Sequence, residues 1–100
     1  MPTYNSALMG ANFRPNEAKE IVRALQSGDV LTAEREPGNP YDPNAIMVRK
    51  DDAHLGYIGR GLAEELSPLI DNHGAALSLR VSGFLNPLKP YLAVELSYPE

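Results

Sequence analysis

The sequence of 100 residues contains no cysteine. This absence excludes disulfide bonds, a thiolate nucleophile and any zinc site built on cysteine ligands. No apolar run approaches the roughly 18 residues that span a bilayer. The first residues also lack the basic and apolar regions of a signal peptide. Together these absences predict a cytoplasmic location and no membrane partner.

Positive charge is scarce as well. Nine Lys and Arg residues stand against 13 Asp and Glu residues, for a formal net charge of −4 and a pI of about 5.1. Proteins that coat nucleic acid by charge make many phosphate contacts, so this composition argues against that class. A small site with two or three arginines stays open. The length and the apolar fraction of 43% predict one globular domain, residues 1–100.

The motifs that commonly carry catalysis are missing. There is no Walker loop, no GxGxxG and no GxSxG elbow. Asp42 and Asn44 resemble the opening of a calcium loop, but the glycine and the closing glutamate of such a loop do not follow. His54 and His73 are not spaced as zinc ligands and are interpreted as surface histidines near turns. We therefore expect no metal, no cofactor and no enzymatic activity.

Two helices are predicted from apolar residues at helical spacing. The first covers about 16 to 27, with Asn16 as its N-cap and Gly28 just after its end. The second covers about 61 to 72, and Pro68 is expected to break or kink it near Ser67. Their apolar stripes are Ala18, Ile21, Val22 and Leu25 for the first helix, and Leu62, Leu66, Leu69 and Ile70 for the second.

Six short strands are predicted from alternation and from their flanking turn residues. They cover residues 6–13, 29–36, 44–50, 55–59, 76–84 and 91–98. The last two strands alternate most clearly. In residues 76–84 the inward face carries Leu77, Leu79 and Val81, and in residues 91–98 one face carries Leu92, Val94 and Leu96. This element count predicts a mainly β fold, a small antiparallel β-barrel of about six strands with two helices.

The densest concentration of special residues lies between the second and third strands. Three prolines, at 37, 40 and 43, each fix φ near −65° and stiffen the chain. An aromatic ring, a carboxylate and two carboxamides lie among them: Tyr41, Asp42, Asn39 and Asn44. These residue types serve equally well in a stiff hairpin turn and in a recognition surface. Composition alone does not choose between the two.

A longer pattern starts at this loop. R-E-P-x-N-P-Y-D-P-N-A-I-x-V begins at Arg35, and L-G-Y-I-x-R-x-L-A-x-x-L begins at Leu55. The pattern resembles the HIRAN domain, from roughly Leu8 to Asp71 with a weaker tail to Leu96. The resemblance implies an OB-like β-barrel with helices, in agreement with the element count. It also implies capture of the 3′ end of single-stranded DNA, in DNA repair or stalled-fork processing.

The resemblance assigns roles to the central loop. Tyr41 would stack on the terminal base, and Asp42 would accept a hydrogen bond from the 3′-hydroxyl. Asn39 is the matching upstream amide. Asn44 is expected to be structural, tying the loop to its own backbone in an Asx turn.

Further DNA-binding residues are implied outside the loop. Arg60 matches a basic residue that meets phosphate, and Tyr57 lies on the strand before it. Phe13 matches a second aromatic. Asn12 stands where the fork-remodelling member has a basic residue, and Arg14 could replace that contact. Tyr91 matches, more loosely, an aromatic of the last hairpin.

Three functions therefore compete. The first is a non-enzymatic module for 3′ ends of single-stranded DNA, with a helicase or nuclease as a further partner. The second is an interaction or regulatory adaptor that keeps the fold without binding DNA, which the acidity and Asn12 favour. The third, a small hydrolase or nuclease, lacks the clustered ligands that metal-assisted cleavage needs.

Overall fold

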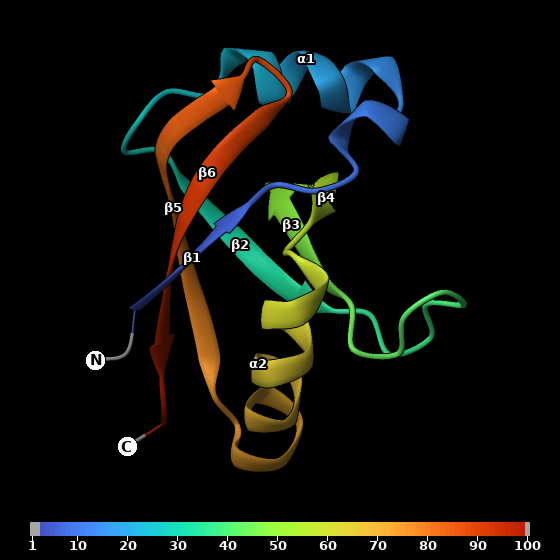
Figure 1. Cartoon of the computed structure of the whole chain (residues 1–100), viewed down its shortest axis with the longest axis vertical. Helices are drawn as coiled ribbons and strands as arrows, with labels where there is room; N and C mark the ends of the chain where they lie inside the picture. The colour runs from blue at the N-terminus through green and yellow to red at the C-terminus, as the bar shows by residue number, and fades with distance from the viewer. Residues whose placement is uncertain (1–2, 100) are drawn as a thin grey trace.

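The computed structural model describes residues 3–99 as a six-stranded antiparallel sheet with two α-helices and one 3-10 turn. The predicted mainly β fold with two helices is confirmed. Figure 1 shows the twisted sheet, with α1 across one end and α2 beside its lower half. The elements are β1 (Thr3–Ala7), η1 (Ala11–Phe13), α1 (Asn16–Ala24), β2 (Val30–Arg35), β3 (Ile46–Lys50), β4 (Ala53–Tyr57), α2 (Arg60–His73), β5 (Ala76–Asn86) and β6 (Lys89–Ser97).

The sheet has the strand order β1-β6-β5-β2-β3-β4. Its two edges approach one another where the chain leaves β1 (Figure 1). There Met9 and Tyr57 exchange two backbone hydrogen bonds, each of 2.8 Å. In residues 3–99 this isolated bridge is the backbone pairing between β4 and the segment after β1, so the sheet is not a closed barrel. "Barrel" describes the fold only loosely.

Gly56 allows the two edges to come this close. A Cβ atom at this position would lie 2.5 Å from the carbonyl oxygen of Met9 and 3.0 Å from Cδ1 of Leu8. Real Cβ atoms do not approach backbone oxygens so closely, which makes this a site where only glycine fits without a shift. The bridge in turn fixes Tyr57 beside the segment that leads to Phe13.

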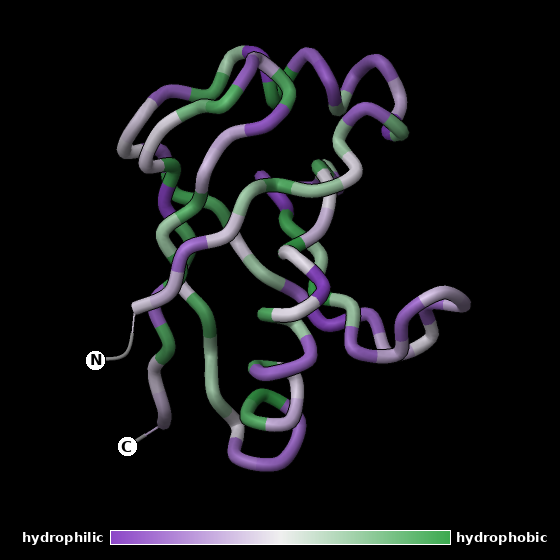
Figure 2. The backbone as a smooth tube through the Cα atoms, viewed as in Figure 1, coloured by the Kyte–Doolittle hydropathy of each residue, from purple (hydrophilic) through white to green (hydrophobic). Residues whose placement is uncertain are grey.

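The core forms where the alternating apolar residues of the strands meet the helices. Leu79 and Val81 of β5 are buried, as are Leu92, Val94 and Leu96 of β6, so their predicted inward faces are confirmed. The helices contribute Val22 from α1 and Leu66 from α2, both with no exposed surface. Figure 2 shows the apolar residues concentrated along the strands, whereas the loop between β2 and β3 is mostly polar.

The first predicted strand is wrong in its extent. β1 ends at Ala7, and the chain then turns into η1 rather than continuing to residue 13. Gly10 makes the turn with φ of 77°, a left-handed conformation that glycine adopts without strain. The amide of Phe13 donates to the Gly10 carbonyl at 3.1 Å. Phe13 therefore projects from a tight turn and not from a strand.

The first helix is shorter than predicted at its C-terminal end. α1 begins at Asn16 with Pro15 as its N-cap, so Asn16 is its first residue and not its cap. The helix ends at Ala24 because Leu25 turns to extended backbone, and Leu25 is only 5% exposed. Gly28 does not cap the helix. Its amide donates to the Val81 carbonyl at 2.7 Å, within the connection to β2.

The second helix is not broken at its proline. α2 runs from Arg60 to His73 through Pro68, so the helix does not break there, and the predicted alternative, a kink near Ser67, stays a prediction. A proline inside a helix removes one hydrogen bond and costs about 3 kcal/mol. Burial of Leu66 and Ser67 just before it opposes that cost. The strand limits also shift slightly, and β4 includes His54, which was expected in a turn.

Candidate functional site

The loop of residues 36–45 is shaped by its own side chains. Oδ1 of Asn39 accepts from the backbone amides of Tyr41 at 2.8 Å and Asp42 at 3.0 Å. Oδ1 of Asp42 accepts from the amide of Asn44 at 2.9 Å. Such Asx turns replace the regular backbone bonds that a loop lacks. Asn39 and Asp42, together with the three prolines, thus define one conformation.

Arg35 holds the loop from below. Its guanidinium donates to the carbonyls of Ala45 at 2.7 Å and Pro43 at 2.9 Å. It also forms two 3.0 Å bonds to the Asp71 carboxylate of α2. These bonds hold the pKa of the Asp71 carboxyl below its ordinary value. The Arg35 side chain is only 11% exposed, so the base of the loop is fixed both to β2 and to α2.

Asn44 provides a second attachment to α2. Its Oδ1 accepts from the hydroxyl of Ser67 at 3.0 Å, and Ser67 is 1% exposed. The structural role expected for Asn44 agrees with this contact, but the expected Asx turn to its own backbone is wrong. The packed face of α2 supplied a partner that the loop sequence could not reveal.

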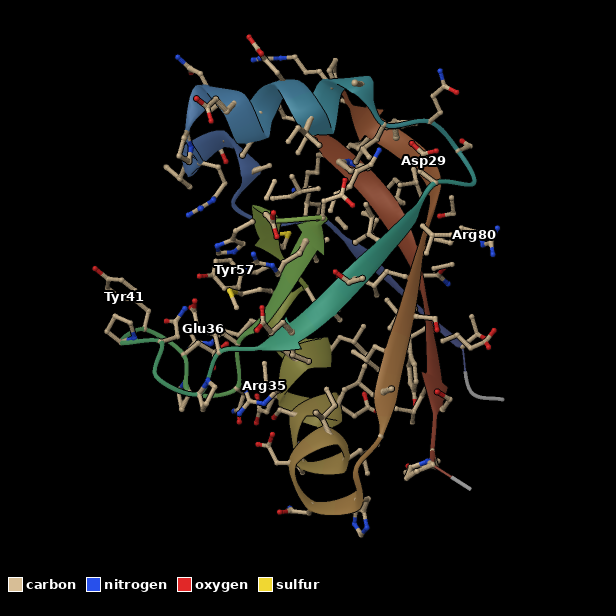
Figure 3. All side chains as sticks on the ribbon, turned by 180° about the vertical axis from the view of Figure 1, so that it is seen from behind. Asp29, Arg35, Glu36, Tyr41, Tyr57 and Arg80 are labelled. Carbon is tan, nitrogen blue, oxygen red and sulfur yellow. The ribbon has the colours of Figure 1, made fainter. Side chains whose placement is uncertain are left out.

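A third set of bonds lies between the loop and β4. Oε1 of Glu36 accepts from Nδ2 of Asn39 at 2.6 Å and from the hydroxyl of Tyr57 at 2.8 Å. Figure 3 shows Glu36 and Tyr57 facing one another, with Tyr41 at the far end of the loop. The Tyr57 hydrogen bond, helped by Asn39, lowers the pKa of the Glu36 carboxyl. Burial, and then the Glu36 carboxylate, raise the pKa of Tyr57.

The loop forms one wall of a cleft of about 490 Å³. The turn after β1 forms the opposite wall, and the end of β4 with the start of α2 forms its floor. Seven of the nine sequence-predicted site residues line it: Phe13, Arg14, Asn39, Tyr41, Asp42, Tyr57 and Arg60. The fold therefore brings together residues spread over 48 positions of the sequence.

The chemistry of the cleft differs between its mouth and its interior. The Phe13 and Tyr41 side chains are 84% and 87% exposed and present free ring faces. The Asp42 side chain is only 18% exposed, and its Oδ2 lies 4.0 Å from Nε of Arg60. Arg60 is 78% exposed, so its guanidinium is free to meet an anion from solvent. Arg14 donates through Nε to the His54 carbonyl at 3.0 Å.

Two predicted site residues lie outside this cleft. Asn12 lines a neighbouring hollow of about 430 Å³, together with Asn86 and Lys89 of the last hairpin. Tyr91 is 42% exposed and lies opposite Ala7 in the pairing of β1 with β6. Asn12 shares its hollow with Phe13 but does not line the main cleft, and neither does Tyr91, so their predicted contacts with DNA stay predictions.

Sequence reasoning missed several residues of the site. Met9, Gly10, Ala45 and Ile58 also line the cleft. Glu36 lies beneath it and had no assigned role. The signal available for Glu36 was its place in the R-E-P-x-N-P opening of the HIRAN-like pattern.

Metal binding and membrane insertion find no support in the part of the chain that the structure describes. Residues 3–99 contain no cluster of three His, Asp or Glu side chains that could hold a metal ion. Within the same range, no helix has both the length and the apolar character to cross a membrane.

Comparison with known proteins decides the family. A family model described as the HIRAN domain matches residues 2–96. The chain belongs to the HIRAN domain family. The predicted resemblance is thus confirmed over nearly the whole sequence.

Two curated HIRAN relatives match parts of the chain. A Fanconi-associated nuclease 1 homolog from Oryza sativa subsp. japonica is 43% identical over 73 residues, which are 69% of this chain and 7% of that protein. Helicase-like transcription factor from Oryctolagus cuniculus is 37% identical over 49 residues, which are 48% of this chain and 5% of that protein. The chain thus spans less than a tenth of the length of these relatives.

Solved structures confirm the fold. The crystal structure of the HIRAN domain of human HLTF superposes with a TM-score of 0.78 at 22% identity, covering 98% of this chain and 77% of that one. A Lactobacillus plantarum protein superposes with a TM-score of 0.81 at 25% identity, covering 97% and 98%. An NMR structure of the HLTF HIRAN domain in its DNA-bound conformation gives 0.66 at 23% identity, covering 94% and 73%.

Proposed function

We propose that this chain is a non-catalytic module that binds single-stranded DNA and captures its 3′-hydroxyl end in the cleft. The observation that carries the proposal is the convergence of Phe13, Tyr41, Asp42 and Arg60 on one cleft from separate parts of the sequence. Membership of the HIRAN family supports the same ligand, since a HIRAN domain of HLTF has been solved in a DNA-bound conformation.

The two exposed rings supply affinity without sequence preference. Phe13 and Tyr41 lie on opposite walls of the cleft, and both have free faces. Stacking of a base on an aromatic side chain contributes about 1–3 kcal/mol and tolerates every base. An unpaired terminal nucleotide fits such rings, whereas bases stacked within a duplex do not offer their faces.

Asp42 supplies the preference for an end. One of its oxygens is engaged by the Asn44 amide, and Oδ2 is directed toward the arginine side of the cleft. A carboxylate accepts a hydrogen bond from a hydroxyl but repels a phosphate. A 3′-hydroxyl is therefore favoured over a 3′-phosphate. In this proposal Arg60 and Arg14, which line the same cleft, meet the phosphates upstream.

Fluorescence anisotropy at low salt tests this proposal. A labelled oligonucleotide with a free 3′-hydroxyl is compared with the same oligonucleotide ending in a 3′-phosphate and with a blunt duplex. We expect the free 3′-hydroxyl to bind most tightly, with a shallow salt dependence because few phosphates are contacted. Equal affinities for the two single strands would refute capture of the end.

The first prediction concerns the loop ring. Tyr41→Ala should weaken binding of the 3′-hydroxyl oligonucleotide by about 1–3 kcal/mol, because one stacked base is lost. Tyr98→Ala is the matched control, since Tyr98 is 50% exposed and does not line the cleft. Equal losses in the two variants would show that Tyr41 does not stack on the ligand.

The competing proposal is an adaptor that keeps the HIRAN fold and binds a protein. The net charge of −4 favours it, since acidic proteins repel DNA outside a local site. If no oligonucleotide binds at low salt, the adaptor function is favoured over DNA binding. In the DNA-binding case, a helicase or nuclease partner would process the captured end, as the names of the curated relatives suggest.

A further inference from the structure

We propose that Glu36 is the positioning residue of the cleft: its carboxylate fixes the direction of the Asn39 carboxamide, and this amide in turn holds Tyr41 and Asp42 in place. The inference deepens the DNA-end function proposed above and rests on it for its binding consequences. Its structural part concerns the free protein and stands on contacts within residues 36–57.

The first step is the direction of the Asn39 side chain. A carboxamide has one accepting and one donating end, and the two can exchange by a half-turn. In this structure the accepting end faces the amides of Tyr41 and Asp42, at 2.8 and 3.0 Å. The opposite direction would point the NH₂ group at two N–H donors. The loop conformation therefore depends on which way this one amide points.

The second step is what selects that direction. Nδ2 of Asn39 donates to Oε1 of Glu36 at 2.6 Å and, over a longer 3.3 Å, to the Tyr57 hydroxyl; the carboxylate, unlike the hydroxyl, can only accept. Reversal of the amide would place its carbonyl oxygen against the carboxylate, with two acceptors and no proton between them. The Tyr57 hydroxyl also donates to Oε1, at 2.8 Å, which leaves the carboxylate committed to its present position.

The third step is the charge of Glu36. The hydrogen bond from Tyr57, and then that from Asn39, lower the pKa of the carboxyl group, so Glu36 is ionised at neutral pH. Hydrogen bonds to an ionised acceptor are roughly twice as strong as those between neutral groups. Three side chains, Tyr57 of β4, Glu36 and Asn39, thus form a continuous series of hydrogen bonds that ends at the amides of Tyr41 and Asp42.

Glu36 itself does not line the cleft. Its effect on a ligand must therefore pass through the placement of Tyr41 and Asp42. Without it, both residues would sample several positions, and ordering them would cost binding free energy. The preference for a 3′-hydroxyl over a 3′-phosphate should fall as well, because that preference needs the Asp42 carboxylate at a defined place.

The experiment compares Glu36→Leu and Glu36→Gln with the unaltered chain. Leucine keeps much of the volume but removes the acceptor, whereas glutamine keeps an acceptor oxygen and should rescue. Glu34→Leu is the matched control, because Glu34 lies two residues away on β2 with its side chain 58% exposed. The readouts are NMR amide exchange at Tyr41 and Asp42, affinity for the 3′-hydroxyl oligonucleotide, and the ratio of that affinity to that for the 3′-phosphate.

We expect the two amides to exchange slowly in the unaltered chain. In Glu36→Leu they should exchange at least about tenfold faster, because this factor corresponds to the loss of one charge-assisted hydrogen bond. Affinity should fall by a similar factor, and the hydroxyl-to-phosphate ratio should approach one. Glu36→Gln should restore all three readouts for the most part, and Glu34→Leu should leave them unchanged.

Two results would overturn the inference. One is unprotected Tyr41 and Asp42 amides in the unaltered chain, a measurement that needs no variant to fold. The other concerns the Glu36→Leu variant. Either its Tyr41 and Asp42 amides stay fully protected from exchange, or it binds DNA more weakly with an unchanged ratio of affinities for the 3′-hydroxyl and the 3′-phosphate. If no chain binds DNA, the proposed function fails, while amide exchange still decides whether Glu36 positions the loop.

Discussion

Two proline-rich connections of this chain contrast with one another. The 36–45 loop contains Pro37, Pro40 and Pro43. The tip between β5 and β6 contains Pro87, and Pro90 is the second residue of β6. From sequence, both are stiff turns. In the structure, the tip is closed by strand pairing up to Asn86 and Lys89, with a single side-chain bond from the Leu88 amide to Asn86 at 3.0 Å.

The 36–45 loop is held in another way. It leaves the paired strands after Arg35 and returns at Ile46, with one backbone bond from the Glu36 amide to the Ala45 carbonyl at 2.9 Å across its base. Side chains from β2, β4 and α2 then hold the loop from outside. Proline content therefore does not distinguish a site from a turn. The distinguishing feature is that elements outside the loop commit polar side chains to its shape.

The strongest way to break this contrast is to remove Arg35. Arg35→Ala should lower the free energy of unfolding by about 3 kcal/mol, because charge-assisted bonds to the Pro43 and Ala45 carbonyls are lost. Urea unfolding measures this value. Arg80→Ala, at an exposed position of β5, should change it by no more than about 0.5 kcal/mol. Similar losses in both variants would mean that the loop is not specially anchored.

The next largest effect is expected at Gly56. Gly56→Ala should cost about 2 kcal/mol, because its Cβ would meet the Met9 carbonyl oxygen at 2.5 Å and force the two cleft walls apart. Gly83→Ala, near the hairpin tip, is the matched control because a Cβ there meets nothing within 4 Å. Thermal unfolding of the two variants gives the comparison. A tolerated alanine at 56 would remove the steric reason given for that glycine.

A smaller difference is expected between two asparagines. Asn44→Ala should cost about 1 kcal/mol or slightly more, because it leaves the buried Ser67 hydroxyl without its partner. Asn86→Ala removes one exposed bond at the hairpin tip and should cost a few tenths of a kcal/mol. Urea unfolding should also show that Asn44→Ala and Ser67→Ala are not additive. Additive losses would contradict a direct bond between them.

The smallest effect is a pH dependence that comes from His54 of β4. Burial, and then the positive charge of Arg14, lower the pKa of His54 below its ordinary value of 6.5, and Arg49 lowers it slightly further. The Gly56 carbonyl and the Glu36 carboxylate raise this pKa, but by less. The unfolded chain therefore binds a proton more readily, so His54 lowers stability as the pH falls through 6.5. His54→Gln should flatten unfolding free energies measured between pH 7.5 and 5.5. An unchanged slope would contradict this origin.

The sequence was most informative where a local pattern is sufficient. Alternation in β5 and β6 predicted which residues are buried, because each strand has one face on the core and one in water. The spacing of apolar residues predicted the two helices, because each helix also has one face on the core and one in water. The spacing did not predict the end of α1, because Leu25 leaves the helix to enter the core. It also did not predict that α2 continues through Pro68, next to the buried Leu66.

For the site, the sequence identified individual residues but not their contacts. Seven predicted residues meet in one cleft, and the resemblance alone had grouped them. Glu36 and Tyr57 are 21 residues apart, and Arg35 and Asp71 are 36 apart. Such pairs arise from the register of β3 and β4 and from the placement of α2. No local rule of spacing predicts them.

The pairing of the first strand with the last has a consequence for how this chain is made. Ala7 lies opposite Tyr91, and the Leu8 amide donates to the Pro90 carbonyl at 2.8 Å. Phe13 follows directly on this segment. In a nascent chain on the ribosome, the 36–45 loop can form before β1 has paired with β6. Pairings between strands so far apart in sequence also form slowly. The segment that leads to Phe13 therefore gains its partner in the sheet only after the residues of β6 (Lys89–Ser97) have been synthesised.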